Sequence, residues 1–342
     1  MTQNSGILWE HENMELVDSM INGNIISMAR LISLVESGDD QVPQIMKHVY
    51  PHTGKAYRIG LTGPPGVGKS TLVDKLTSVI RSQDLTAGII AVDPTSPFSG
   101  GAVLGDRIRM QQHYLDQGVF IRSMATRGSL GGLPKTASEV INIMDASGKD
   151  IILIETVGVG QSELDIIKNA DTVVVILAPG AGDSIQTMKA GLLEIADIFV
   201  INKADNPGAD DLVSEIQTML QLNTRKHEIW EIPVIATQAI NNYGVETLYQ
   251  QIHSHHQTIS KSGVLAQQRK EQRREQFINT IEQEISAELL RMMKRDIQLK
   301  EYINKVEMAE IDPYSAAYEI LSSATLLDML AQQLLQRKRH ND

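Results

Sequence analysis

The chain has 342 residues, of which 42% are hydrophobic, a formal net charge of −11 and no cysteine. This length allows one full α/β domain and a smaller accessory part. The lack of cysteine excludes disulfides and thiolate metal sites, and the acidity argues against nucleic acid as the main partner. No stretch approaches the roughly 20 apolar residues of a membrane span, and the N-terminal residues lack the basic-then-apolar order of a signal peptide. We therefore expect a cytoplasmic protein that binds proteins and small anions, with no membrane partner.

The first region, residues 1–56, has the apolar spacing of helices. One apolar face ends at Asn22-Gly23-Asn24, and a second runs from Met28 to Val35 before Gly38. Polar and glycine residues at these points predict helix breaks. We expect an N-terminal helical extension that leads into the next region through a short linker.

Residues 63–70 carry the phosphate-binding signature Gly-x-x-x-x-Gly-Lys-Ser. The signature lies between a β-rich run and a segment with helical apolar spacing, which is the setting that phosphate binding needs. There the backbone N–H groups point inward, Lys69 reaches the β- and γ-phosphates, and the Ser70 hydroxyl holds Mg²⁺. The segment predicts a nucleoside triphosphate site, whose expected binding residues are Gly63, Pro64, Pro65, Gly66, Val67, Gly68, Lys69, Ser70 and Thr71.

Short apolar runs alternate with helical segments through residues 57–256. This order predicts a parallel sheet with right-handed crossovers and helices on both faces. The expected fold class is therefore α/β, a P-loop NTPase with a mostly parallel central sheet and helical extensions at both ends. The predicted strands are 57–62, 88–92, 119–121, 151–154, 172–177, 198–201 and 234–236.

Acidic residues follow two of the predicted strands. Asp93 ends one strand and Glu155 another, so both carboxylates are expected at the carboxyl edge of the sheet, near the phosphates. Asp106 lies in the glycine-rich segment 100–109, which we interpret as a switch loop. Surface acids at strand ends are the alternative interpretation. Oxygen ligands suit Mg²⁺, and the expected metal-binding residues are Ser70, Asp93, Asp106 and Glu155.

The sequence Asn202-Lys203-Ala204-Asp205 directly follows a predicted strand. A carboxylate at Asp205 accepts hydrogen bonds from both the N1–H and the amino group of guanine, and adenine offers neither in that geometry. An ordinary turn after a strand is the alternative. The segment Thr237-Gln238-Ala239 follows the next strand, and we expect its backbone N–H groups to face the guanine carbonyl. The expected guanine-binding residues are Asn202, Lys203, Asp205, Thr237, Gln238 and Ala239.

The last region, residues 257–342, shows helical patterns and no strand pattern. A heptad-like apolar seam runs through residues 278–293, and its spacing fits either an internal core or a dimer interface. We interpret the histidines of residues 253–256 as a solvated helix end rather than a metal site. Arg269-Lys270 and Arg273-Arg274 are interpreted as an exposed helix face.

Taken together, these segments resemble the MeaB/ArgK family, GTPases that assist adenosylcobalamin-dependent methylmalonyl-CoA mutase. The matching segments are 92–96, 100–106, 155–163 and 202–205. The resemblance implies a GTP-hydrolysing chaperone that gates cofactor loading or protection of an acyl-CoA mutase, with GTP/GDP and Mg²⁺ as ligands. It also implies a homodimer formed by the C-terminal helices. No Asp-x-His-x-x-Gly sequence occurs, so we expect no directly bound cobalamin.

The sequence does not identify the residue that positions the hydrolytic water. Gly158 lies where many GTPases sense the γ-phosphate, and Gln161 is a candidate for positioning water. Arg107 and Arg109 are candidates for neutralising developing charge, or are solvated charges. The expected catalytic residues are Lys69, Asp106, Glu155 and Gln161, and we expect slow turnover that a partner accelerates.

The sequence leaves two other functions open. A metal-insertion GTPase shares the nucleotide chemistry, but usually needs a Cys/His metal site. A protein kinase-like ATPase linked to amino-acid transport is the second, because relatives have carried that label. The guanine-binding sequence favours a GTP switch over phosphate transfer to a protein.

Overall fold

The structure, a computed structural model, describes residues 14–93, 110–126, 133–157, 163–180, 194–222, 229–323, 328 and 332. The chain divides into two units, Met1–Lys270 and Glu271–Asp342. In the described part, no helix has the length and apolar character needed to cross a membrane.

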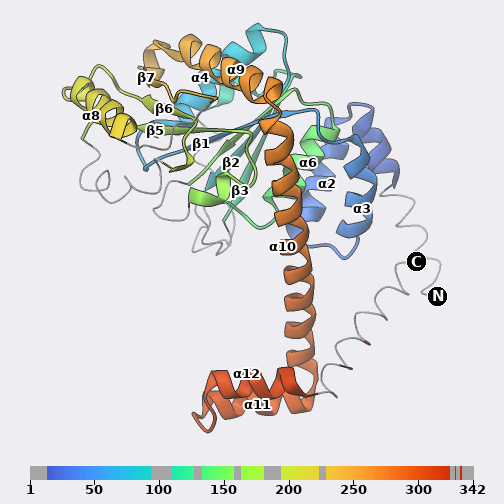
Figure 1. Ribbon diagram of the computed structural model, residues 1–342. Coiled ribbons are helices and arrows are strands. Elements are labelled where there is room, and N and C mark those ends of the chain that lie inside the picture. Colours follow the sequence, from blue (N-terminus) through green and yellow to red (C-terminus); the bar gives the residue numbers. More distant parts are fainter. Residues whose placement is uncertain are drawn as a thin grey trace. The chain divides into compact units, whose positions relative to one another are not determined.

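A parallel sheet forms the centre of the first unit (Figure 1). Its seven strands have the order β3-β2-β4-β1-β5-β6-β7, and every pairing is parallel. All seven predicted strands are confirmed, and three of them extend one to four residues beyond the predicted ends. The bounds are β1 Tyr57–Thr62, β2 Ala87–Asp93, β3 Val119–Ala125, β4 Ile151–Glu155, β5 Thr172–Leu177, β6 Ile198–Ile201 and β7 Val234–Ala236.

Helices α4 (Lys69–Ser82) and α9 (Val245–Lys261) cover one face of this sheet, as Figure 1 shows. Leu72 and Leu76 of α4, with Leu248 of α9, join the inward-facing strand residues in one core and are fully buried. Burial on both faces explains why the strands are continuously apolar rather than alternating.

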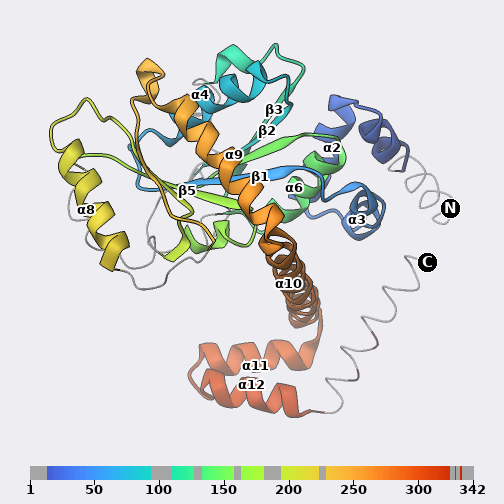
Figure 2. The same ribbon diagram turned by 45° about the horizontal axis from the view of Figure 1, so that its top comes forward.

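The opposite face is covered by two groups of helices (Figure 2). Helices α2 (Ile25–Ser37), α3 (Val42–Val49) and α6 (Ala137–Ala146) share a core with β2, β3 and β4, and α8 (Ala209–Leu222) shares another with β5 and β6. The N-terminal helices are therefore part of the first unit. Short 3-10 helices span Tyr50–His52, Gln111–His113, Glu163–Ile166 and Ala239–Asn241.

The predicted break between the N-terminal helices is confirmed. The side chain of Asn24 caps α2 by accepting from the backbone N–H groups of Ile26 and Ser27, at 2.9 and 3.1 Å. Gly38 ends the helix with φ 70°, a conformation that glycine adopts at little cost.

After α9, the described residues form α10 (Val264–Arg295), α11 (Ile297–Glu307) and α12 (Pro313–Ser322). The boundary that we expected after residue 256 falls inside α9, because the apolar spacing of that helix continues to the buried Ile259. The first unit then continues through the start of α10 to Lys270.

Candidate nucleotide-binding site

The phosphate loop connects β1 to α4 and is shaped by its glycines. Gly63 has φ 141° and Gly68 has φ 97°, which L side chains rarely adopt. A Cβ at Gly63 would lie 2.0 Å from the carbonyl oxygen of Ile176, and one at Gly68 would lie 2.4 Å from the Asn202 amide nitrogen. Both positions therefore need glycine for space as well as for conformation.

Lys69 opens α4 and is 7% exposed. Its ammonium group donates to the backbone carbonyls of Gly63 and Pro64, at 2.8 and 3.0 Å. The side chain thus curls back over the loop that precedes it. A lysine ammonium held at the phosphate loop can neutralise the charge of bound phosphates.

The carboxyl edge of the sheet brings a hydroxyl and two carboxylates toward the start of α4. Ser70 donates to Glu155 at 2.7 Å. Ala91 of β2 lies opposite Glu155 of β4, and strand alternation places Asp93 on the same α4-facing side. Both acids are buried, at 8% and 3% exposed. This set of hard oxygen donors fits Mg²⁺.

Asn202 ties three segments together through its side-chain amide. Its nitrogen donates to the carbonyl of Val67 in the phosphate loop at 2.8 Å. Its oxygen accepts from the Thr237 hydroxyl at 3.0 Å and from the Ala239 N–H at 3.1 Å. The residue is 3% exposed. Asn202, which we expected to bind the nucleotide, here holds the phosphate loop and the 237–239 segment in register.

The guanine segment, Asn202-Lys203-Ala204-Asp205, is exposed to solvent at its last residue. Lys203 has φ 58°, and the following Ala204 N–H donates to the Thr237 carbonyl at 3.0 Å. This bend leaves Asp205 exposed. The carboxylate is therefore available to a base that enters beside the phosphate loop.

The backbone of the 237–239 segment differs from our expectation. Thr237 N–H donates to the Ile201 carbonyl at 2.9 Å, and Gln238 N–H donates to the Tyr243 carbonyl at 3.0 Å. Ala239 N–H is taken by Asn202. These N–H groups bond within the protein because they close the ends of β6 and β7, instead of facing a guanine carbonyl.

Comparison with known proteins agrees with this site. Residues 28–294 match the family described as Methylmalonyl Co-A mutase-associated GTPase MeaB. The chain belongs to this family. The matched range includes the phosphate loop, both acidic strand ends and the guanine segment.

Individual relatives cover most of the chain. A Pyrococcus abyssi protein named only as a GTPase is 50% identical over 309 residues, which are 90% of this chain and 95% of the relative. The Mus musculus protein named methylmalonic aciduria type A homolog, mitochondrial, is 33% identical over 287 residues, with 79% and 69% coverage. The solved structure of an LAO/AO transport system kinase has a TM-score of 0.66 and 25% identity, and covers 94% of this chain and 97% of its own. This MeaB-family protein is thus a GTPase of the P-loop class, and membership implies that it binds GTP and GDP.

Some expected residues of the MeaB-family site lie outside the described residues. These are Asp106, Gly158 and Gln161, together with Arg107 and Arg109. Their roles as metal ligand, phosphate sensor and hydrolytic groups stay predictions.

Sequence reasoning missed a hydroxyl pair beneath the site. Thr62, the last residue of β1, and Thr156, which follows β4, are hydrogen-bonded through their hydroxyls at 2.9 Å and are both buried. The Thr156 N–H also donates to the Leu61 carbonyl at 3.1 Å. The pair fixes the residue after Glu155 to the start of the phosphate loop. Its only sequence signal is a threonine beside each motif.

The interpretation of the histidine cluster as a solvated helix end is wrong. Helix α9 continues to Lys261, and His255 is 3% exposed. Its Nδ1 and the Thr172 hydroxyl are hydrogen-bonded at 2.6 Å, and His256 stacks on Tyr57 with ring centroids 3.8 Å apart. Burial lowers the pKa of His256. The described residues include no group of three or more metal-binding side chains.

Proposed function

We propose that this GTPase is a chaperone that gates cofactor loading or protection of an adenosylcobalamin-dependent acyl-CoA mutase of the methylmalonyl-CoA type. The observation that carries the proposal is the match of residues 28–294 to a family of mutase-associated GTPases. The mouse relative with a methylmalonic aciduria name supports the same direction. Cobalamin is then held by the partner, in a shared cytoplasmic compartment.

The nucleotide is held by groups at the carboxyl edge of the sheet. The backbone N–H groups of residues 63–71 receive the phosphates, Lys69 neutralises their charge, and Asp205 selects guanine. Mg²⁺, when bound, would neutralise part of the phosphate charge. Its ligands in this proposal are Ser70, Asp93, Asp106 and Glu155.

Hydrolysis in this proposal is slow until the partner binds. Gly158 senses the γ-phosphate, and Gln161 positions water. Loops attached to the γ-phosphate are ordered in the triphosphate state and released after hydrolysis, which is a physical two-state element. The mutase would stabilise the ordered state and so accelerate turnover.

The second unit is proposed to form a homodimer. Its helix α10 presents Phe277, Ile281 and Ile285 at 65%, 43% and 42% exposed. Among the described residues, the core of this unit consists of Met292 and Leu299. Apolar area of this kind is stabilised by burial against a partner, and a second copy of α10 has the same apolar seam.

Single-turnover GTP hydrolysis with and without a methylmalonyl-CoA mutase tests the proposal. We expect the mutase to accelerate hydrolysis about tenfold or more, and to co-purify better with a non-hydrolysable GTP analogue than with GDP. The Lys69→Ala variant is the control for contaminating hydrolases. Equal rates in both reactions, together with no co-purification, would contradict the mutase role and leave the GTPase assignment intact.

A kinase linked to amino-acid transport is the second candidate, because the solved structure of an LAO/AO transport system kinase has this fold. Transfer of ³²P from γ-labelled nucleotide to a protein separates the two functions. We expect labelled inorganic phosphate and no labelled protein. Equilibrium dialysis of the same preparation with Ni²⁺ distinguishes a metal-insertion GTPase from the proposed mutase chaperone.

A further inference from the structure

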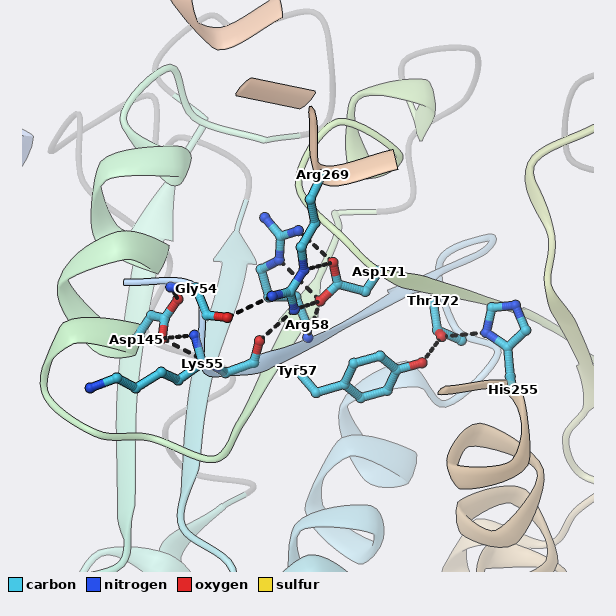
Figure 3. Close-up of polar contacts among 10 residues, drawn as sticks. Gly54, Lys55, Tyr57, Arg58, Asp145, Asp171, Thr172, His255 and Arg269 are labelled. Carbon is cyan, nitrogen blue, oxygen red and sulfur yellow. Dashed lines mark hydrogen bonds and ion pairs between the residues drawn. The ribbon is translucent and has the colours of Figure 1, made fainter. Parts of the chain in front are cut away.

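At the amino edge of the sheet, opposite the nucleotide site, one buried carboxylate accepts hydrogen bonds from two arginines (Figure 3). Asp171 precedes β5, and its side chain is 0% exposed. It accepts from the backbone N–H of Arg58 at 2.9 Å and from the guanidinium of the same residue. Arg269 of α10 donates to both oxygens, at 3.0 and 2.7 Å. The expectation that Arg269 belongs to an exposed helix face is therefore wrong.

Arg269 also binds the linker that leads into β1. Its guanidinium donates to the carbonyls of Gly54 and Ala56, each at 2.8 Å. The backbone N–H groups of these two residues donate to Asp145 of α6, at 2.6 and 2.9 Å. One side chain thus connects the first turns of α10 with β5, with the linker and, through the linker, with α6.

Of the two arginines that pair with Asp171, Arg269 is the one that can leave without removing all neutralising charge from the carboxylate. Burial alone would raise the pKa of Asp171, but hydrogen bonds and charge from Arg269 and Arg58 hold it below its ordinary value. Breaking a buried ion pair is costly when it leaves a charge without compensation. If Arg269 leaves, Arg58 still neutralises Asp171, because strand pairing of β1 with β5 keeps it in place.

The neighbouring helix α9 is fixed differently. His255 bonds to the Thr172 hydroxyl, which also bonds to the Tyr57 hydroxyl, and His256 stacks on the Tyr57 ring. These contacts are side-chain packing on β1 and β5, and His255 Nε2 also lies 3.5 Å from Asp197 Oδ1. Between α9 and α10 the chain turns at Gly263, which has φ 79° and open space around its Cβ position.

The same two strands reach the nucleotide site at their other ends. Strand β1 contains Arg58 and ends at the phosphate loop. Strand β5 follows Asp171 and contains Ile176, against whose carbonyl Gly63 packs without room for a Cβ. The paired strands β1 and β5 therefore form a continuous path from the phosphate loop to the cluster. Packed interiors transmit strain rather than absorb it.

We propose that Arg269 is a nucleotide-responsive latch, with a closed state that holds the start of α10 on Asp171 and an open state in which Arg58 alone pairs with Asp171. Such coupling requires that the two states differ in contacts that both the nucleotide and the start of α10 affect. The latch lies directly before Glu271, where the second unit begins. It goes beyond the proposed mutase role and does not depend on it.

Hydrogen exchange on the full chain, without any mutase, tests the latch. We expect residues 54–57 and 264–270 to exchange at different rates with GDP and with a non-hydrolysable GTP analogue. In Arg269→Ala both nucleotides should give the same fast exchange, about tenfold above the protected wild-type state, since charged hydrogen bonds are lost. Nucleotide affinity should stay within about twofold, because Arg269 does not contact the site.

Matched variants separate a latch from a simple structural ion pair. Arg273→Ala removes the same charge from an exposed position of the same helix, and should keep the wild-type nucleotide difference. Arg269→Lys keeps the charge but loses the forked geometry, and should give intermediate protection. The latch is overturned if wild-type exchange at these residues is the same with both nucleotides, or if Arg269→Ala keeps the nucleotide difference.

Discussion

The two units of this GTPase bury their apolar residues to very different extents. In the first unit, strand residues such as Ile59, Leu153 and Val174 are fully buried. In the second unit, Phe277, Tyr314 and Tyr318 are 65%, 87% and 74% exposed. The first unit therefore gains its hydrophobic stabilisation internally, whereas the second exposes surface of the kind that marks interaction sites. Nucleotide chemistry and assembly should accordingly respond to substitutions in different units.

The largest effect is expected for Lys69→Ala. Loss of the buried ammonium beside the phosphates should lower GTP turnover about a hundredfold or more, as measured by single-turnover hydrolysis. Lys75→Ala changes a lysine of the same helix that contacts Asp74 at 3.4 Å, and should keep wild-type turnover. A changed oligomeric state in Lys69→Ala would break the separation between the units.

The second-largest effect is expected for Asp205, the residue proposed to recognise the guanine base. Asp205→Asn replaces the acceptor for guanine by an amide, which donates where guanine also donates. We expect GTP affinity to fall about a hundredfold or more, and XTP, with a carbonyl at that position, to bind better than GTP. Titration of both nucleotides measures this, with Asp211→Asn on α8 as the control. Unchanged preference for GTP would remove Asp205 from the base site.

A third substitution addresses the second unit. Ile281→Asp with Ile285→Asp places charges on the exposed face of α10, where each side chain contributes about 1.5 kcal/mol or more when buried. We expect the proposed dimer to dissociate in sedimentation experiments, while basal GTP turnover stays at the wild-type value. Glu282→Gln on the same helix is the control. A dimer that persists in the double variant would require another interface.

A smaller effect is expected for Asn202→Ala. The change leaves the Val67 carbonyl and the Ala239 N–H, both in buried residues, without this amide partner. The free energy of unfolding of the first unit should fall by about 2 kcal/mol, which urea denaturation measures through its midpoint. Asn241→Ala, at an exposed position, should change it little. Equal midpoints would mean that Asn202 contributes through the nucleotide instead.

The smallest effect is a pH dependence at Asp171. Its pKa is lowered from 3.8 in the folded protein, so its ion pairs stabilise the fold above that pH and lose this contribution as the pH falls through the folded pKa. Arg269→Ala should bring the pKa closer to 3.8 and so reduce the loss of stability on acidification. Urea midpoints at neutral and acidic pH measure the difference. An identical acid dependence in both proteins would contradict the role of Arg269.

Sequence patterns predicted the local features of the first unit well. Apolar runs predicted the strands, and the break at Asn22-Gly23-Asn24 predicted the ends of the N-terminal helices, because these depend on residues close together in the chain. The phosphate loop was predicted for the same reason. The expected boundary after residue 256 falls inside α9, because His255 is polar in sequence but buried beside Thr172, and His256 stacks on Tyr57.

By itself the sequence determined the order of elements, the parallel sheet and the positions of the phosphate and guanine segments, since each is encoded within a few consecutive residues. Only the tertiary structure decided which side chains meet. Asn202 and Val67 are 135 positions apart, and Arg269 and Asp171 are 98 apart. Such contacts depend on how the strands are ordered in the sheet. The sequence therefore gives the charge and the hydrogen-bonding groups of each polar residue, but the fold determines which residue it contacts.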